Sequence, residues 1–389
     1  MNVTVLRYID RIVGVTFLKI SSLYPHHVSI PTHPRRILLI KLFGFGNFIF
    51  LSPTIKNLRR LYPRATIDVL TFDQNKDICR MYNSYIDTVH TVRFSIIGMS
   101  YDIASFCVTH YHNYDIIIDL EQFIRLSAIM GTLLGPRYFV GVSTKNSHKH
   151  SAFDLNIPYK EDRHIVEEYY GIVRTLKIVS RSAVAIDQTP QLQRPVVSLN
   201  TAYKKLARRI LLEKNRRVIV GICSGGRLDD AERRYPPELF AKFVNRLLQD
   251  ERILIVFFGS RQEESQIQSI RGMLTNPDKT VMYTRLPLEQ SAYFVSKTDV
   301  FISNDTGPLH LAAALGVFCV GLYGPSKEWV YGPYTSKKII LRDTAHPPIR
   351  SNHNEKNTGW NSQWWPSPDK VYKEVSGIIK QIKHEKKIR

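Results

Sequence analysis

The sequence predicts an α/β protein made of two doubly wound domains, each with a parallel β-sheet. Three observations support this prediction. Short apolar, β-branched runs alternate with helical patterns, the alternating series occurs twice, and a polar break separates the two series. Runs that are apolar almost throughout are typical of strands buried on both faces of a parallel sheet. A chain of 389 residues is also long enough for two domains of roughly 150 residues each.

The individual elements follow from the same patterns. The strand candidates of the first series lie at residues 37–43, 66–71, 115–120 and 138–142. Those of the second series lie at residues 218–223, 253–258, 280–283, 300–303 and 319–322. Helical patterns follow at residues 52–61, 237–248 and 290–296. Because ligands of doubly wound domains bind at the carboxyl ends of the strands, the loops after these strands are the candidate functional regions.

The expected domain boundary lies within residues 188–195, a polar stretch with two prolines and no apolar periodicity. We therefore predict an N-terminal segment at 1–34, a first domain at 35–190, a second domain at 191–345, and a C-terminal segment with a final helix at 346–389. The N-terminal segment combines apolar residues with Arg7, Arg11 and Lys19, so it is too charged to span a bilayer. It suits either an amphipathic helix on a membrane surface or a helix packed on its own domain.

The chain carries a large excess of positive charge, with 54 Lys and Arg against 34 Asp and Glu. This excess predicts attraction to a polyanion, which can be nucleic acid, an anionic membrane surface or a phosphorylated substrate. A solvated basic surface without a dedicated partner is the alternative. Nucleic acid is disfavoured because the sequence contains no recognisable nucleic-acid-binding module and no basic–aromatic stacking pattern.

The four cysteines, Cys79, Cys107, Cys223 and Cys319, form no CxxC pair, and three of them lie in or beside apolar runs. Buried, reduced thiols explain this pattern better than disulfides or zinc ligands. The cysteine usage therefore predicts a cytoplasmic protein without a zinc site.

The first candidate loop contains Gly44, Gly46 and Asn47, and it lies between the first strand and a helix that we expect to open at Ser52. A dinucleotide-binding fingerprint needs a third glycine where this chain has Ile49, so a nicotinamide cofactor is disfavoured and no cofactor is expected. The glycines still allow a ligand to approach the backbone closely, with Asn47 directed at it. The alternative is a tight turn that binds nothing.

The second candidate loop follows the strand at 300–303 and contains Asp305, Thr306, Gly307 and His310. A helix begins within it, so unpaired backbone N–H groups and the positive end of the helix dipole face the carboxyl edge of the sheet, as a diphosphate requires. Asp305 either caps this helix or binds ligand hydroxyls. His310 either contacts phosphate or has a structural role.

The third candidate loop follows the strand at 218–223 and begins with Ser224 and Gly225. The glycine permits close approach of a ligand, and Arg227, Arg233 and Arg234 follow it. These arginines are suited to neutralise a leaving diphosphate, although a solvated basic loop is the alternative.

Taken together, these segments resemble glycosyltransferase family 9, the ADP-heptose heptosyltransferases of lipopolysaccharide core assembly. The similarity runs from about residue 35 to residue 356. Four stretches carry it in the same order, at residues 37–63, 114–135, 221–236 and 303–326. The stretch at 303–326 is the most specific of the four.

The resemblance implies the GT-B architecture, with two Rossmann-like domains facing an interdomain cleft. It places the acceptor on the first domain and the nucleotide-diphosphate sugar, ADP-heptose by default, on the second. It also implies an inverting, metal-independent transfer to a glycan or lipid-linked acceptor at the inner face of the cytoplasmic membrane. The final helix is then expected to pack back on the first domain. A general base deprotonates the acceptor hydroxyl, and the helix start at 305–310 stabilises the leaving diphosphate.

The sequence departs from the family pattern at Asn47, where the best-known members carry the aspartate taken as the general base. An amide accepts no proton near neutral pH. Glu121 and Asp119, at the end of the strand at 115–120, are the substitutes that we nominate, and helix capping or an internal ion pair, for example with Arg125, is their alternative role. The chain is otherwise a catalytically inactive homologue that binds a nucleotide sugar or glycan, or, less favoured, a nucleotide-sugar epimerase.

A second departure lies beyond residue 356, where relatives often carry cysteines. This chain has Trp360, Trp364 and Trp365 instead. The tryptophans predict either a different acceptor or a different packing contact in this segment.

Overall fold

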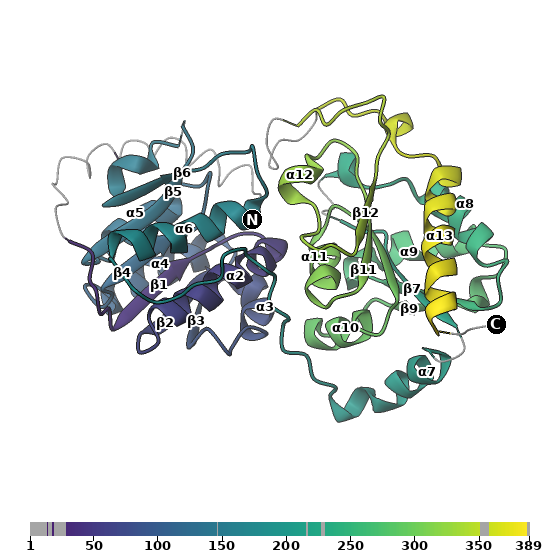
Figure 1. Cartoon of the computed structure of the whole chain (residues 1–389), viewed down its shortest axis with the longest axis horizontal. Helices are drawn as coiled ribbons and strands as arrows, with labels where there is room; N and C mark the ends of the chain where they lie inside the picture. Colours follow the sequence, from purple (N-terminus) through teal and green to yellow (C-terminus); the bar gives the residue numbers. More distant parts are fainter. Residues whose placement is uncertain are drawn as a thin grey trace. The chain divides into compact units, whose positions relative to one another are not determined.

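The structure is a computed structural model that describes residues 29–145, 147–214, 217–226, 230–350 and 358–386, together with Gly14 and Leu18. The chain divides into two compact units, Met1–Gln193 and Arg194–Arg389 (Figure 1). The division falls within the polar stretch at 188–195. Apart from Gly14 and Leu18, the N-terminal segment expected to form an amphipathic helix lies outside the described residues.

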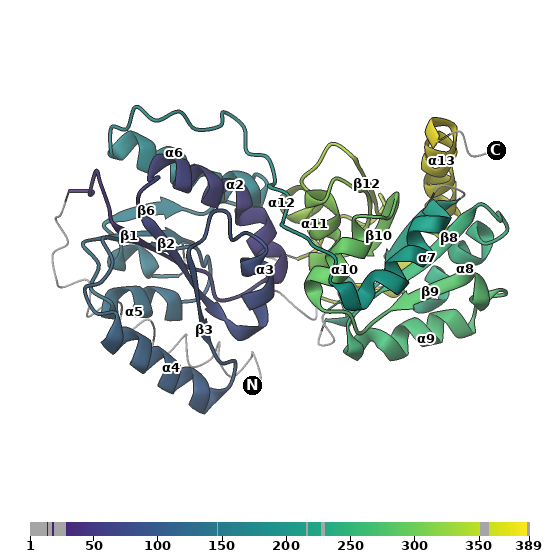
Figure 2. The same cartoon turned by 90° about the horizontal axis from the view of Figure 1, so that it is seen from below.

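The first unit contains a six-stranded sheet of order β3-β2-β1-β4-β5-β6 in which all neighbouring strands are parallel. Its strands are β1 (Arg36–Ile40), β2 (Thr66–Phe72), β3 (Thr88–Val92), β4 (Ile116–Asp119), β5 (Tyr138–Ser143) and β6 (Leu155–Pro158). Its helices are α2 (Phe45–Leu61), α3 (Lys76–Arg80), α4 (Ile96–Thr109), α5 (Leu126–Leu133) and α6 (Ile165–Val179), with short 3-10 turns at Asp73–Asn75 and Lys149–Ala152. Helices α2 and α6 cover one face of this sheet, and α4 and α5 cover the other (Figure 2).

The second unit repeats this plan with a parallel sheet of order β12-β11-β10-β7-β8-β9. Its strands are β7 (Val218–Cys223), β8 (Ile253–Phe258), β9 (Thr280–Tyr283), β10 (Val300–Asn304), β11 (Phe318–Leu322) and β12 (Lys338–Leu341). Its helices are α7 (Lys204–Lys214), α8 (Pro237–Leu247), α9 (Glu264–Gly272), α10 (Leu288–Val295), α11 (Gly307–Ala314), α12 (Glu328–Tyr331) and α13 (Pro368–Lys386). The 3-10 turns are Thr201–Tyr203, Ala231–Arg233, Arg261–Glu263, Pro277–Lys279 and Ser362–Trp364.

Each sheet reverses its strand order at one point, which lies between β1 and β4 in the first unit and between β7 and β10 in the second. The registers pair Ile40 with Asp119 and Ser303 with Cys223 at these points. Loops at such a reversal diverge and leave a crevice outside the carboxyl ends of the strands. The doubly wound α/β prediction is therefore confirmed. The three candidate loops follow β1, β7 and β10, and Asp119 and Glu121 lie at the end of β4, the fourth strand at these reversals.

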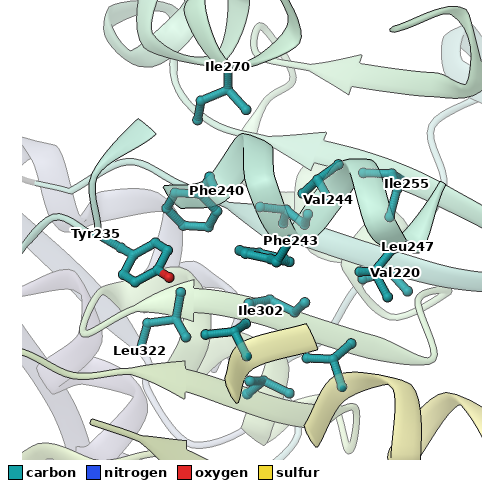
Figure 3. Packing of buried hydrophobic residues seen from close by; sticks show 14 of the residues in the cluster. Val220, Tyr235, Phe240, Phe243, Val244, Leu247, Ile255, Ile270, Ile302 and Leu322 are labelled. Carbon is teal, nitrogen blue, oxygen red and sulfur yellow. The ribbon is translucent and has the colours of Figure 1, made fainter. Parts of the chain in front are cut away.

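The core of the second unit is built from the apolar face of α8 on the sheet, with Phe240, Phe243 and Val244 fully buried above Val220 and Ile302 (Figure 3). Prolines suit the start of this helix, because backbone N–H groups in the first turn have no partner within the helix and the N–H that proline lacks costs no hydrogen bond.

The final helix, α13, packs on α8 and β7 of the second unit (Figure 1). Its buried residues Val371, Val375 and Ile379 are four apart and join the same core as α8. Lys386 pairs with Asp299 at 2.7 Å beyond this stripe. The apolar stripe of α13 is thus buried in the second unit, and the expectation that the final helix also packs on the first domain stays a prediction.

Helix α2 begins at Phe45, so the expectation that a helix opens at Ser52 is wrong. Pro53 lies inside the helix and cannot donate to the carbonyl of Ile49, four residues earlier. The Ser52 hydroxyl donates to that carbonyl oxygen at 2.7 Å instead. This substitution keeps the carbonyl paired and lets the helix run through the proline.

All four cysteines are buried and free, as predicted. Burial raises the pKa of the Cys107 thiol to about 11 and those of Cys223 and Cys319 to about 12. Among the helices in the described part of the chain, none is both long and apolar enough to cross a membrane.

Candidate functional site

The first crevice contains a buried ion pair between Lys41, directly after β1, and Glu121, just after β4. Lys41 Nζ lies 2.9 Å from Glu121 Oε2. The other carboxylate oxygen accepts hydrogen bonds from the backbone N–H groups of Leu42 at 2.8 Å and Phe43 at 2.7 Å. Burial lowers the pKa of Lys41, but Glu121 and Tyr169 outweigh it and raise that pKa above its ordinary value. Glu121 therefore fixes the start of the loop between β1 and α2.

Asp119, the last residue of β4, forms a second buried ion pair with Lys149 at 2.7 Å, and both side chains are fully buried. Its carboxylate also accepts from Ser127 Oγ at 2.9 Å and from the backbone N–H of Glu121 at 3.0 Å. Burial raises the pKa of Asp119, while Lys149 and these hydrogen bonds oppose the shift. The pair ties the loop after β4 to the segment after β5.

Both nominated carboxylates thus take part in internal ion pairs, with lysines rather than with Arg125. In each carboxylate both oxygens are occupied, by one lysine and by N–H or O–H donors. The role of either residue as a general base stays a prediction, and these contacts support an anchoring role.

The loop after β1 holds Asn47 close to its own start. Gly44 caps α2 with φ +95°, and Gly46 lies in the first turn. A Cβ atom on Gly44 would lie only 2.4 Å from Asn47 Nδ2, so a side chain there is excluded both by conformation and by space. The backbone N–H of Asn47 donates to the Gly44 carbonyl at 2.9 Å. The side-chain amide of Asn47 is therefore held at the carboxyl edge of the first sheet, and the residue is partly exposed.

In the second crevice, Asn304 ties the two candidate loops together. Its Nδ2 donates to the carbonyl oxygens of Ser224 and Gly225, both at 2.9 Å. Its Oδ1 accepts from the backbone N–H of Tyr235 at 3.0 Å. Asn304 lies in the stretch at 303–326 that resembles the family, but the sequence alone predicted no role for its side chain.

Arg233 and Asp305 connect the same loops by charge. Arg233 Nη2 lies 2.8 Å from Asp305 Oδ2, with 11% and 3% of the two side chains exposed. Tyr323 donates its hydroxyl to Asp305 Oδ1 at 3.4 Å, and His310 Nε2 lies 3.8 Å from the same oxygen. Asp305 does not precede α11 directly, since the N-cap is Thr306. The carboxylate of Asp305 is thus placed beside Arg233 rather than on the helix end.

The start of α11 lies against the loop after β7. The Thr306 hydroxyl lies 2.9 Å from Ser303 Oγ, and Gly307 and Pro308 open the helix. A Cβ atom on Gly226, at φ +157°, would lie 3.5 Å from Thr306 Cγ2. This is an ordinary van der Waals distance, so the loop lies beside the helix start with room for a Cβ atom.

Ser224 Oγ and Arg233 Nε are buried in this crevice and lack a hydrogen-bond partner among the described residues. Buried hydroxyl and guanidinium groups are rarely left unpaired in a folded protein. Both atoms are therefore candidates for contacts with a polar ligand.

Sequence reasoning missed Glu263, which faces the loop after β7 from the turn after β8. Its Oε1 accepts from the backbone N–H of Gly226 at 2.9 Å, and its Oε2 accepts from Ser260 N–H at 2.7 Å. A Cβ atom on Gly225 would lie 1.6 Å from Oε1. Its position could have identified Glu263 as a candidate, because it also follows a strand in the interior of the second sheet.

The tryptophans of the C-terminal segment pack on the second unit. Trp360 and Trp365 belong to its buried core, and Trp365 contacts Tyr235 edge-on at 5.6 Å. Trp364 stacks on His346 at 4.6 Å. These contacts favour packing as the role of the tryptophans.

Within the described ranges, no group of three or more His, Cys, Asp and Glu side chains is placed to hold a metal ion. Arg227, the first arginine of the third candidate loop, lies outside those ranges.

The chain is similar to known glycosyltransferases over most of its length. The model of glycosyltransferase family 9 (heptosyltransferase) matches residues 110–359. Lipooligosaccharide heptosyltransferase 2 of Haemophilus ducreyi is 22% identical over 362 residues, covering 88% of this chain and 99% of that protein.

Two solved structures match the fold. E. coli ADP-heptose lps heptosyltransferase II has a TM-score of 0.66 at 18% identity, covering 90% of this chain and 99% of that chain. The family 9 glycosyltransferase from Veillonella parvula has a TM-score of 0.70 at 19% identity, covering 91% of this chain and 99% of that chain. These similarities show the GT-B type of fold. Because the family model spans more than half of the chain, the protein belongs to glycosyltransferase family 9, the heptosyltransferases, and is a glycosyltransferase.

Proposed function

We propose that the protein transfers a heptose or a related sugar from a nucleotide-diphosphate donor to a lipopolysaccharide-core or other glycan acceptor. ADP-heptose is the default donor. The observation that carries the proposal is the second crevice, where Arg233, the start of α11 and the buried Ser224 hydroxyl converge. The relatives named as heptosyltransferases support the choice of sugar.

The donor diphosphate is expected to bind at the start of α11. The first backbone N–H groups of a helix have no partner within the helix and carry a partial positive charge. Arg233 adds a full charge and a buried Nε that has no partner among the described residues. Its ion pair with Asp305 holds the guanidinium in one orientation. These groups would stabilise the negative charge that develops on the leaving diphosphate.

The acceptor is expected to bind at the first crevice, beside Gly44, Gly46 and Asn47. The Asn47 amide can orient an acceptor hydroxyl by hydrogen bonding, but it cannot accept a proton near neutral pH. In an inverting reaction the acceptor oxygen attacks the anomeric carbon on the face opposite the leaving diphosphate, and its proton passes to a general base. We propose that Glu121 and Asp119 shape this loop through their lysine pairs.

We further propose that no metal takes part, that the enzyme acts on the cytoplasmic side of the inner membrane, and that nucleic acid is not a partner. The absence of a DxD motif in the sequence supports the first point. The basic charge supports binding of phosphorylated or anionic partners.

The test is a transfer assay with ADP-heptose and a lipopolysaccharide-core acceptor, with UDP- and GDP-sugars in parallel. Release of ADP together with a heavier acceptor supports the transfer, while an isomerised donor would indicate an epimerase. The anomeric configuration of the product tests inversion, and activity in EDTA tests independence of metal.

The variant Glu121→Gln separates the two roles of that residue. If Glu121 only anchors the loop, its replacement lowers the rate but leaves the shape of the pH profile of kcat/KM unchanged. If Glu121 is the general base, its replacement removes the acidic limb of that profile.

A further inference from the structure

Helix α4 exposes an apolar stripe. The exposed fractions are 86% for Ile97, 67% for Tyr101 and 79% for Val108. These residues lie four and seven positions apart, so they occupy one side of the helix. Tyr111 and Leu133 are also exposed and extend the apolar area beyond the end of α4. We call these five residues the α4 surface.

The α4 surface is nearly free of charge. Between Phe94 and Tyr114 the only Lys, Arg, Asp or Glu is Asp102. Arg93 binds this carboxylate through Nη2 at 2.7 Å and Nε at 2.9 Å, and it lowers the pKa of Asp102. Contiguous exposed apolar areas on a folded protein usually mark an interaction site.

Arginines stand at both ends of the α4 surface. The Arg93 guanidinium lies 5.9 Å from the centre of the Tyr101 ring and its side chain is largely exposed. At the other end, Tyr111 lies against Gly135, and the exposed Arg137 follows two residues later. Aliphatic side chains, tyrosines and flanking arginines together match the interfacial region of an anionic bilayer.

The α4 surface continues into the acceptor-side loop. Phe94, just before α4, contacts Phe72 at 5.0 Å and Phe43 at 5.8 Å between ring centres. The backbone N–H of Phe43 is bound by Glu121 in the loop that leads to Asn47. Because α4 begins at the carboxyl end of β3 in a parallel sheet, its first turn lies at the same edge as that loop.

We propose that the α4 surface docks on an anionic lipid bilayer and so brings the acceptor-side loop to the membrane. Ile97, Tyr101 and Val108 enter the interfacial region. Arg93 and Arg137 pair with Asp102 and Asp115 in the free protein; such exposed pairs are weak, so both guanidinium groups can turn to lipid phosphates. The inference rests on the proposed function only in expecting an acceptor anchored in lipid.

The experiment is flotation of the full chain with vesicles of phosphatidylcholine and phosphatidylglycerol, compared with phosphatidylcholine alone. We expect binding to the anionic vesicles that weakens in high salt. The double variant Ile97→Glu, Val108→Glu should bind at least about tenfold more weakly, because both side chains lose their apolar contact. The control Leu212→Glu changes a 63%-exposed apolar residue of α7 and should bind as the wild type does.

A second variant, Ile97→Ser with Val108→Ser, removes the apolar groups without adding charge and should also weaken binding. Thermal unfolding of each variant checks its folding. Unchanged flotation of both double variants, or no flotation of the wild type, would overturn the proposal. A wild-type dimer that becomes monomeric in the double variants would overturn it in favour of a second copy as partner. Loss of sugar transfer with intact flotation would contradict only the proposed function.

Discussion

The Arg233 guanidinium lies 2.8 Å from the Asp305 carboxylate, and this ion pair joins the loop after β7 to the loop after β10. Both groups are almost completely buried at the reversal of strand order, where doubly wound sheets bind their ligands. Several properties of the enzyme are expected to depend on this junction.

Replacing Arg233 should weaken both the fold and donor binding. Arg233→Gln leaves the Asp305 carboxylate buried without its cation, which costs about 3–5 kcal/mol of unfolding free energy. It also removes a positive charge from the proposed diphosphate site. Urea denaturation measures the first effect and calorimetric titration with ADP the second. Arg285→Gln is the matched control, since it breaks an exposed pair with Glu264 that is worth only about 0–1 kcal/mol. Equal ADP affinity in Arg233→Gln and the wild type would remove Arg233 from the donor site.

Adding a methyl group at Gly225 should impair donor binding more than stability. A Cβ atom there would lie 1.6 Å from Glu263 Oε1, so the Glu263 carboxylate must move and release the N–H of Gly226. Losing this internal hydrogen bond costs about 1 kcal/mol of unfolding free energy, and the displaced loop is expected to bind ADP at least about tenfold more weakly. In the control Gly272→Ala nothing lies within 4 Å of the new atom, and the helix gains up to about 1 kcal/mol. Similar ADP affinities for the two variants would contradict the close approach of Glu263.

The buried pair of Lys149 and Asp119 predicts a large stability effect. Lys149→Met leaves the fully buried Asp119 unpaired, with an expected cost of about 3–5 kcal/mol. The double variant Lys149→Met, Asp119→Asn should recover part of this loss, because it no longer buries a charge. Chemical denaturation of the two variants measures the difference. A loss below about 1 kcal/mol in Lys149→Met would show that the pair is not an anchor.

The pH dependence of stability should report on Glu232. Burial raises the pKa of this carboxyl, but hydrogen bonds from Thr358 and Gly359 and the charge of Arg350 bring it below the ordinary value of 4.5. A carboxyl whose pKa is lowered by folding stabilises the protein above its unfolded pKa, and this stabilisation is lost as the pH falls through the folded pKa. Thermal unfolding of Glu232→Gln should therefore depend less on pH below 4.5 than that of the wild type. Parallel pH curves would contradict this assignment.

The central strands of both sheets could be predicted because they are apolar on both faces. Strands β7 and β8 have the expected bounds, and so does β9, which lies at a sheet edge but is buried except at Met282. The strands β3, β6 and β12 were missed, and all three lie at sheet edges. An edge strand is covered less completely, so it tolerates polar residues and loses the apolar pattern; β3 reads TVHTV and is only partly buried.

The candidate loops could be predicted because glycines and small polar residues follow strands in a readable order. Their partners could not. The roles of these partners, Lys41, Lys149 and Glu263, depend on contacts between segments that are distant in the sequence. The ion pair of Lys149 with Asp119 is one such contact. The start of α2 was also missed, because a proline usually marks the beginning of a helix and the compensating Ser52 hydroxyl has no sequence signature of its own.

The most direct test of the account is the formation of ADP and glycosylated acceptor from ADP-heptose by the wild type and by Arg233→Gln in parallel. The account predicts stoichiometric ADP release and acceptor glycosylation in the wild type, with both strongly reduced in the variant. Tight ADP binding by the wild type without any transfer, to any acceptor and from any donor tried, would contradict it and leave a homologue that only binds nucleotide sugars.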